Sequence, residues 1–284
     1  SALYMVISWL GFLGVLELDR SPAQLLENHT TQGIFFTFST FILALFIREG
    51  LVKNVWFKSL VLVLAVGFIA NLFIILTGRS GYLFFLVGCV VLIFTSVKQY
   101  RVALAVVLLS SIVAGFSLSE TPKARIIQAL HEVETVDSSD AGYSSLGIRV
   151  VMWRTTLQMI VNKPLLGAGS GGFQIDYGKI VANEIGWRSQ IADDPHQQFM
   201  HIAAEHGLVG LGIFVVALMI IAHTLRFSPP LYRDAGYIML LGIGATSLAN
   251  GHFNTFVEGR LVWMVVAVCI PMLNNKIIDL KSTA

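Results

Sequence analysis

Residues 193–225 read DDPHQQFMHIAAEHGLVGLGIFVVALMIIAHTL and carry the chain from a polar segment into a long apolar run. The residues before this junction, from 118 to about 201, hold most of the polar side chains of the chain. Outside that segment the sequence consists mainly of apolar runs. A large polar insert between apolar runs predicts a membrane protein whose chemistry takes place at the membrane surface.

The composition excludes an ordinary soluble domain. Hydrophobic residues make up 55% of the 284-residue chain and charged residues only 13%, whereas soluble domains carry about 25% charged residues. We therefore expect an all-α polytopic membrane protein. The net charge of +2 gives no sign of a nucleic-acid partner. Cys89 and Cys269 lie in apolar runs, as small core residues do, which argues against a disulfide or a metal pair.

The apolar runs predict the membrane spans. A bilayer core needs about 20 mainly apolar residues per helix. Eight segments satisfy or approach this requirement: 2–18, 32–48, 57–77, 80–97, 102–118, 202–225, 235–250 and 261–274. The sequence thus predicts five N-terminal spans within 1–117, an insert at 118–201, and three C-terminal spans within 202–284.

The distribution of Lys and Arg predicts the orientation, because cytoplasmic connections are enriched in these residues. The connections on one side of the membrane hold nine such residues: Arg48, Lys53, Lys58, Lys98, Arg101, Arg226, Arg233, Lys276 and Lys281. The short connections on the opposite side hold only Arg20, Arg79 and Arg260. This bias places the insert outside the cytoplasm, in the periplasm if the membrane is a bacterial inner membrane.

Two amphipathic helices are predicted within the insert. Residues 149–159 have a helical rhythm that ends at Pro164 and the glycine cluster of 167–172, and residues 124–136 form the second helix. The apolar stripe of the first helix is Val150, Trp153, Leu157 and Ile160. Such helices suit a surface that lies on lipid headgroups, and packing of the helices on each other is the alternative.

His196 is the first candidate for catalysis. It follows two aspartates and a proline at a predicted helix start, where backbone N–H groups favour an anion. An imidazole titrates near neutral pH, which suits a general base. After His196 come Gln197, nine residues, Gly207, two residues and Gly210. This spacing resembles the signature of the O-antigen ligase and polymerase superfamily, integral-membrane enzymes that transfer glycans from polyprenyl diphosphate carriers.

Two arginine-containing stretches extend the resemblance, which covers the chain from about Arg79 to its C-terminus. Residues 79–81, Arg-Ser-Gly, resemble the arginine region that the family uses at its carrier-binding site. Arg149 and Arg154 precede the Pro-Leu-Leu-Gly-Ala-Gly stretch at 164–169, and the family shows a similar arrangement. Guanidinium groups bind phosphate oxygens bidentately. Anchoring of Arg79 at headgroups, and a solvated helix face for Arg149 and Arg154, remain the alternatives.

Other polar residues near the span ends are weaker candidates. Gln197, Asn250 and His252 are possible lining of a glycan entrance, although 250–254 is equally consistent with an interfacial turn. The histidines at 196, 201 and 206 follow each other at intervals of five residues. Each is therefore rotated by about 140° from the previous one on a helix, so we expect no metal site. His201 and Glu205 are expected to make only an ordinary i, i+4 contact.

The resemblance implies a fold and a reaction. The fold is a GT-C-like multi-helix bundle with one large periplasmic helical insert, and further N-terminal spans are expected to precede residue 1. In the reaction, an acceptor hydroxyl attacks the anomeric carbon of an undecaprenyl-diphosphate-linked glycan. His196 acts as general base or positions the donor, Arg79 and Arg149 bind the diphosphate, and neither a cofactor nor a metal is needed.

The expected acceptor is lipid A–core, which makes the protein an O-antigen ligase of lipopolysaccharide biosynthesis. An O-antigen repeat-unit polymerase and a protein O-oligosaccharyltransferase are the alternatives with the same chemistry. A lipid-linked glycan transporter is the alternative from another class. Transporters bury ionisable residues near the middle of their spans, whereas the ionisable residues of this chain lie mainly at span ends.

Overall fold

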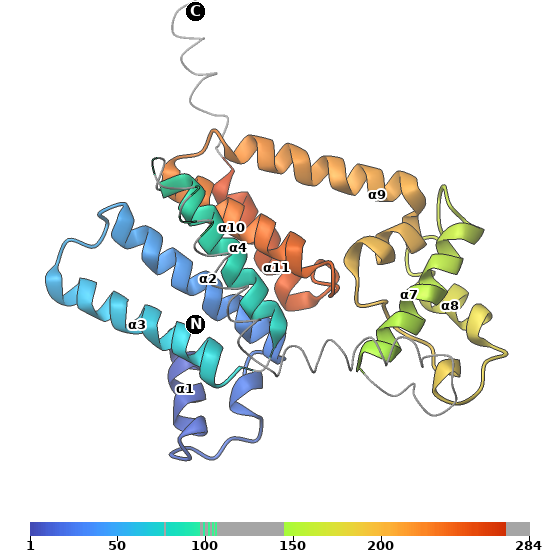
Figure 1. Ribbon diagram of the computed structural model, residues 1–284, viewed down its shortest axis with the longest axis horizontal. Helices are drawn as coiled ribbons and strands as arrows, with labels where there is room; N and C mark the ends of the chain where they lie inside the picture. The colour runs from blue at the N-terminus through green and yellow to red at the C-terminus, as the bar shows by residue number, and fades with distance from the viewer. Residues whose placement is uncertain are drawn as a thin grey trace, which may run out of the picture. The chain divides into compact units, whose positions relative to one another are not determined.

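The computed structural model describes residues 1–76, 78–96 and 145–270, together with positions 99, 102, 104 and 106 (Figure 1). Every regular element within these residues is helical, which confirms the predicted all-α class. Four helices among them are long and apolar enough to cross a membrane: α2 (His29–Arg48), α3 (Val55–Ile74), α4 (Arg79–Ser96) and α9 (Gln198–Leu225). The protein is therefore a polytopic helical membrane protein.

Three more of the predicted spans coincide with shorter helices. These are α1 (Ala2–Phe12), α10 (Pro230–Thr246) and α11 (Phe256–Cys269), with 11, 17 and 14 residues. The span predicted at 102–118 and the amphipathic helix predicted at 124–136 lie wholly or largely outside the described residues. The division into five spans, an insert and three spans thus stays a prediction.

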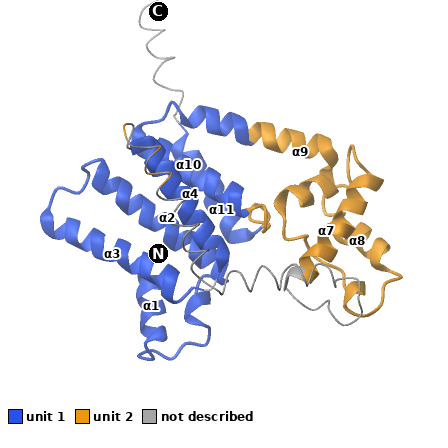
Figure 2. Ribbon diagram, viewed as in Figure 1, with its two compact units in different colours: residues 1–96, 218–246, 255–284 blue, residues 97–217, 247–254 orange. Residues whose placement is uncertain are grey.

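The chain divides into two compact units, shown in blue and orange in Figure 2. The first unit comprises residues 1–96, 218–246 and 255–284. In it, α2 packs against α3, α4 and α10, and α10 also packs against α4 and α11. The short 3-10 helix η1 (Pro22–Gln24) contacts α1 and α2.

Small residues and a buried carboxylate that is paired with arginines stabilise the first unit. A Cβ on Gly33 of α2 would lie 3.2 Å from the Gly81 Cα of α4, so these helices approach closely where neither has a side chain. Arg48 ends α2 and pairs with Asp234 of α10 at 2.6 Å. The Asp234 side chain is 0% exposed, and Arg233 also contacts its carboxylate, at 2.7 Å, so this buried charge is paired with two arginines.

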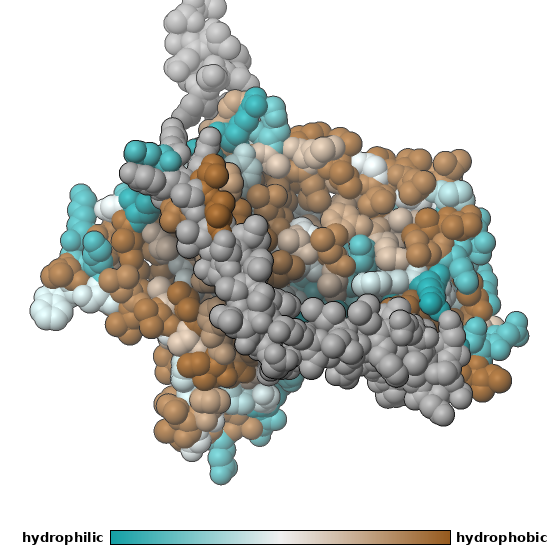
Figure 3. Space-filling view, in the orientation of Figure 1, coloured by the Kyte–Doolittle hydropathy of each residue, from teal (hydrophilic) through white to brown (hydrophobic). Residues whose placement is uncertain are grey.

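The second unit comprises residues 97–217 and 247–254. It contains α7 (Ser145–Asn162), α8 (Phe173–Val181), the 3-10 helix η2 (Gly186–Ser189) and the first part of α9. Its core consists of Met159, Phe173, Tyr177, Val181, Ala192 and Ala204. Exposed apolar side chains run along α9, as a lipid-facing helix requires (Figure 3).

The buried face of α7 differs from the predicted apolar stripe. Met159 is 3% exposed, whereas Leu157, which was predicted to lie on the stripe, is 52% exposed. Thr155 and Thr156 are also buried. The face that α8 covers carries Thr155 and Met159, so the position of α8 determines which side of α7 is buried. Leu157 and Met159 are both apolar, so the sequence pattern does not distinguish them.

Candidate functional site

His196 lies in the loop that leads into α9, two residues before the helix begins at Gln198. Its φ is 50°, and Glu27 is the only other non-glycine residue of the described chain with a positive φ. This left-handed conformation is unfavourable for a residue with a Cβ and persists only where the surroundings hold it. Such strain in a loop at the N-terminus of a helix marks His196 as a candidate for a functional site.

Hydrogen bonds hold the loop on both sides of His196. On one side, the Trp153 Nε1–H of α7 donates to the Pro195 carbonyl at 2.9 Å. On the other, the Gln198 N–H donates to the carbonyl oxygens of Ser247 and Asn250, at 3.0 and 3.2 Å. The His196 backbone is thus fixed by groups from distant parts of the second unit.

Asp194 contacts the His196 imidazole. Its Oδ1 lies 3.2 Å from the His196 Nδ1 and also accepts the His196 backbone N–H. A carboxylate at Nδ1 favours a proton on that nitrogen, which leaves the Nε2 lone pair available as a base. The His196 side chain is 52% exposed, so a substrate hydroxyl can reach it. In the sequence, Asp194 indicated only a helix start, and its contact with His196 is a finding of the structure.

The three predicted lining residues take different positions. The Gln197 Oε1 accepts the Met200 N–H and so caps the first turn of α9. Asn250 is half-buried, and its carbonyl binds the Gln198 N–H. His252 is 1% exposed and therefore lies beneath the surface.

The two glycine-containing motifs of the sequence meet each other in the fold. Gly207 has φ 66° and ψ −173°, which interrupts α9. The Leu208 and Val209 amides consequently leave the helix and donate to the Pro164 and Leu165 carbonyls, at 2.8 and 3.3 Å. The stretch at 164–169 thus supplies the acceptors that the helix break removes.

The same junction also satisfies the carbonyl groups on the other side of the break. Ala168 and Gly169 donate their N–H groups to the Ala204 and Glu205 carbonyls, both at 2.8 Å. A Cβ on Gly167 would lie 2.5 Å from the Glu205 carbonyl oxygen, so a larger residue does not fit there. Residues 164–169 and 204–209 therefore form one rigid joint, called the glycine joint below. Its part in α9 lies C-terminal to the His196 loop.

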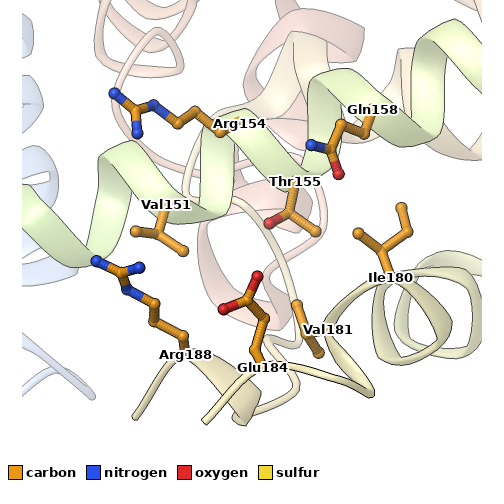
Figure 4. A pocket seen from close by; sticks show the side chains of 8 residues that line it. All are labelled: Val151, Arg154, Thr155, Gln158, Ile180, Val181, Glu184 and Arg188. Carbon is orange, nitrogen blue, oxygen red and sulfur yellow. The ribbon is translucent and has the colours of Figure 1, made fainter. Parts of the chain in front are cut away.

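A cavity of about 230 Å³ lies between α7, α8 and η2 (Figure 4). Arg154 of α7 and Arg188 of η2 line it on opposite walls, with their guanidinium groups toward the same end. Glu184, Gln158 and Thr155 add polar groups that suit hydroxyls. Arg188 had no signal in the sequence, because only the fold brings it beside α7.

The other two predicted arginines lie elsewhere. Arg149 is five residues before Arg154 on α7, which rotates it by about 140° around the helix. Arg79 is an exposed residue at the start of α4 in the first unit. The second unit therefore contains His196, Asp194, Arg149 and Arg154, whereas Arg79 belongs to the first. Among the residues that the structure describes, no three His, Cys, Asp or Glu side chains are placed to hold a metal ion.

Comparison with known families identifies the family of the chain. The profile of a family described as O-antigen ligase matches residues 63–215, more than half of the chain. The chain belongs to the O-antigen ligase family. The matched region includes α4, α7, α8, His196 and both glycines of the signature. No curated protein matches the chain. Members of this O-antigen ligase and polymerase superfamily are glycosyltransferase-like membrane enzymes that act on lipid-linked glycans and an acceptor.

Proposed function

We propose that the protein is an O-antigen ligase that transfers a glycan from undecaprenyl diphosphate to lipid A–core. The 3.2 Å contact between the Asp194 carboxylate and the Nδ1 of an exposed His196 supports this proposal best. This contact orients the His196 imidazole as a base, in the loop that leads into the apolar helix α9. We further propose that this loop faces the periplasm, that the membrane is the bacterial inner membrane, and that five spans precede the insert and three follow it.

In the proposed reaction, the acceptor hydroxyl lies at the His196 Nε2. As its oxygen attacks the anomeric carbon, its proton passes to Nε2. The bond between that carbon and the diphosphate oxygen breaks, and the electron pair leaves on the diphosphate. Asp194 stabilises the imidazolium that forms, and the proton then passes to solvent.

Arginines are proposed to bind the diphosphate and to stabilise the charge that leaves with it. Arg79 and Arg149 keep the roles that the sequence suggested. Arg154 and Arg188 share a cavity, so we add Arg188 to the proposed substrate-binding residues. A guanidinium remains charged and binds two phosphate oxygens at once, which a lysine does not match. Because diphosphate is already a good leaving group, the reaction is proposed to be metal-independent.

Two related activities use the same site with other acceptors. A repeat-unit polymerase would use a second carrier-linked glycan, and a protein O-oligosaccharyltransferase would use Ser or Thr of a protein. The acceptor that fits beside His196 distinguishes them, because the donor half of the reaction is shared.

The test uses the purified chain in proteoliposomes with an undecaprenyl-diphosphate-linked glycan. Lipid A–core, a second carrier-linked glycan and a Ser/Thr peptide are offered in turn, with the His196→Ala variant as control. Glycosylated lipid A–core is expected, at a rate that EDTA leaves unchanged. Transfer only to a carrier-linked glycan or to the peptide would replace the ligase assignment, and equal transfer by the His196→Ala variant would remove the proposed base.

A further inference from the structure

A chain of hydrogen bonds begins at Gln198, whose side chain is fully buried. The Phe253 backbone N–H donates to the Gln198 Oε1 at 2.9 Å, and a backbone amide has no other role than donor in such a bond. The Gln198 amide orientation is thereby determined, and its Nε2 donates to the Asn254 Oδ1 at 3.1 Å. The Asn254 Nδ2 must then point away from Gln198, toward His201.

The orientation of Asn254 determines the tautomer of His201. The Asn254 Nδ2 lies 2.8 Å from the His201 Nδ1, and an amide nitrogen only donates. The His201 Nδ1 therefore accepts, and the proton of the neutral ring is on Nε2. That nitrogen faces the Glu205 Oε1 at 3.6 Å, and the side chain is only 12% exposed.

The other end of this series of hydrogen bonds, at Glu205, contacts α8 and the glycine joint. The Glu205 Oε1 accepts the Phe173 N–H at 3.4 Å, where α8 begins. The Phe173 ring packs on the His201 imidazole, with 4.9 Å between the ring centroids. The Glu205 carbonyl binds Gly169 in the joint described above. His201 thus links the segment at 250–254 to α8 through α9.

The segment at 250–254 also supports the proposed base. A Cβ on Gly251 would lie 3.8 Å from the Asp194 carboxylate, so this segment packs against the residue that orients His196. The Asn250 carbonyl accepts a hydrogen bond from the backbone N–H of Gln198, directly after the His196 loop. A loss of order at 250–254 would therefore be transmitted to the Asp194–His196 pair.

We propose that His201, in its neutral Nε2–H form, is a positioning residue that holds the segment at 250–254 and thereby the Asp194–His196 pair. The effect on transfer rests on the proposed function, whereas the tautomer and the order of the segment do not. His201 itself does not contact the substrate. Its role is to accept the Asn254 hydrogen bond while its ring fills the space beside Phe173.

The first test measures the tautomer without any activity assay. The full chain with ¹⁵N-labelled histidine is placed in lipid nanodiscs, and the His201 signals are assigned by their loss in a His201→Asn variant. An unprotonated Nδ1 and a protonated Nε2 are expected at neutral pH, with a mixture of tautomers in Asn254→Ala. A native His201 that is charged or carries its proton on Nδ1 would overturn the proposal, even if the chain transfers no glycan.

The second test separates positioning from substrate binding. His201→Leu is expected to lower kcat about tenfold or more while KM for donor and acceptor changes by less than about twofold. His201→Asn places an oxygen near the former Nδ1 and should restore much of the rate. His206→Leu is the matched control, because its side chain is 43% exposed and lies 3.8 Å from the same Glu205. This control is expected to keep the native rate.

The possible results lead to different conclusions. A raised KM with unchanged kcat in His201→Leu would mean that His201 contacts a substrate, and an unchanged kcat would mean that it positions nothing. If His201→Leu does not fold, the Asn254→Ala variant is used in its place. Asn254 belongs to the same series of hydrogen bonds, and its side chain is more exposed. In that variant the loss of kcat should accompany faster hydrogen exchange at 250–254, and native exchange would contradict the proposal.

Discussion

The backbone of Gly207 passes so close to Leu165 that a Cβ on residue 207 would lie 2.0 Å from the Leu165 carbonyl oxygen. Gly207 also has a φ of 66°. Both conditions require a residue without a side chain. The first glycine of the signature spacing is thus explained by the joint between α9 and the stretch at 164–169.

Gly207→Ala is expected to destabilise the second unit by more than about 1–3 kcal/mol, because it adds a clash with backbone to an unfavourable φ. Gly212→Ala is the matched control on the same helix, since a Cβ there meets no atom within 4 Å. The control should be neutral or slightly stabilising, as an alanine is in a helix. Thermal unfolding of both variants in one detergent checks this, and equal melting temperatures would contradict the joint.

Asp194→Ala is expected to lower kcat for transfer by roughly ten- to a hundredfold, because the His196 imidazole loses the carboxylate that orients it. The effect should be smaller than in a buried triad, since Asp194 is 32% exposed. Asp193→Ala is the control, because this neighbouring carboxylate binds Gln174 instead. A comparison of both rates at saturating donor decides the assignment, and similar losses in the two variants would speak against it.

Trp153→Phe keeps an aromatic ring at this position, although a smaller one than indole, and removes the N–H that binds the Pro195 carbonyl. One neutral hydrogen bond contributes about 1 kcal/mol, so the rate of transfer should fall by about fivefold. The melting temperature should change little, because the aromatic ring still packs. The measurement is the initial rate beside thermal unfolding, and an unchanged rate would show that the loop needs no support from α7.

Alanine at any of Arg79, Arg149, Arg154 or Arg188 should weaken use of the donor more than use of the acceptor. Loss of a charge-assisted hydrogen bond costs about 1.5–3 kcal/mol, which corresponds to roughly ten- to a hundredfold in donor handling. Lysine should restore only part of this loss, because it keeps the positive charge but lacks the planar guanidinium that binds two phosphate oxygens at once. Transfer rates against donor concentration test each residue, and full activity of a lysine variant would indicate that the arginine only anchors its helix.

The pH dependence of stability should have a small contribution from Asp176. Hydrogen bonds from Lys163 and Lys179 lower its pKa below the ordinary value. Its contribution is therefore present above the pKa of an unfolded aspartate and is lost as the pH falls through the lowered value. Because both lysines are at least half exposed, the contribution should stay below about 1 kcal/mol. Asp176→Asn should weaken this acid dependence in thermal unfolding, whereas an unchanged profile would contradict it.

The sequence alone determined the class of the protein and its local elements. Hydropathy and length are properties of contiguous residues, so α2, α3, α4 and the apolar part of α9 follow from the chain without any tertiary information. The position of His196 before α9 and the helix that became α7 were predictable for the same reason. Both depend on neighbours within a few residues.

Only the tertiary structure decided which residues meet. Leu157 and Met159 are two residues apart and equally apolar, and the packing of α8 decided that Met159 is buried. Arg188 shares a cavity with Arg154, and Asn254 orients His201, across separations that no periodic pattern records. Local sequence determines backbone preference and membrane partition, whereas contacts between distant residues arise only when helices pack, and the proposed site consists mainly of such contacts.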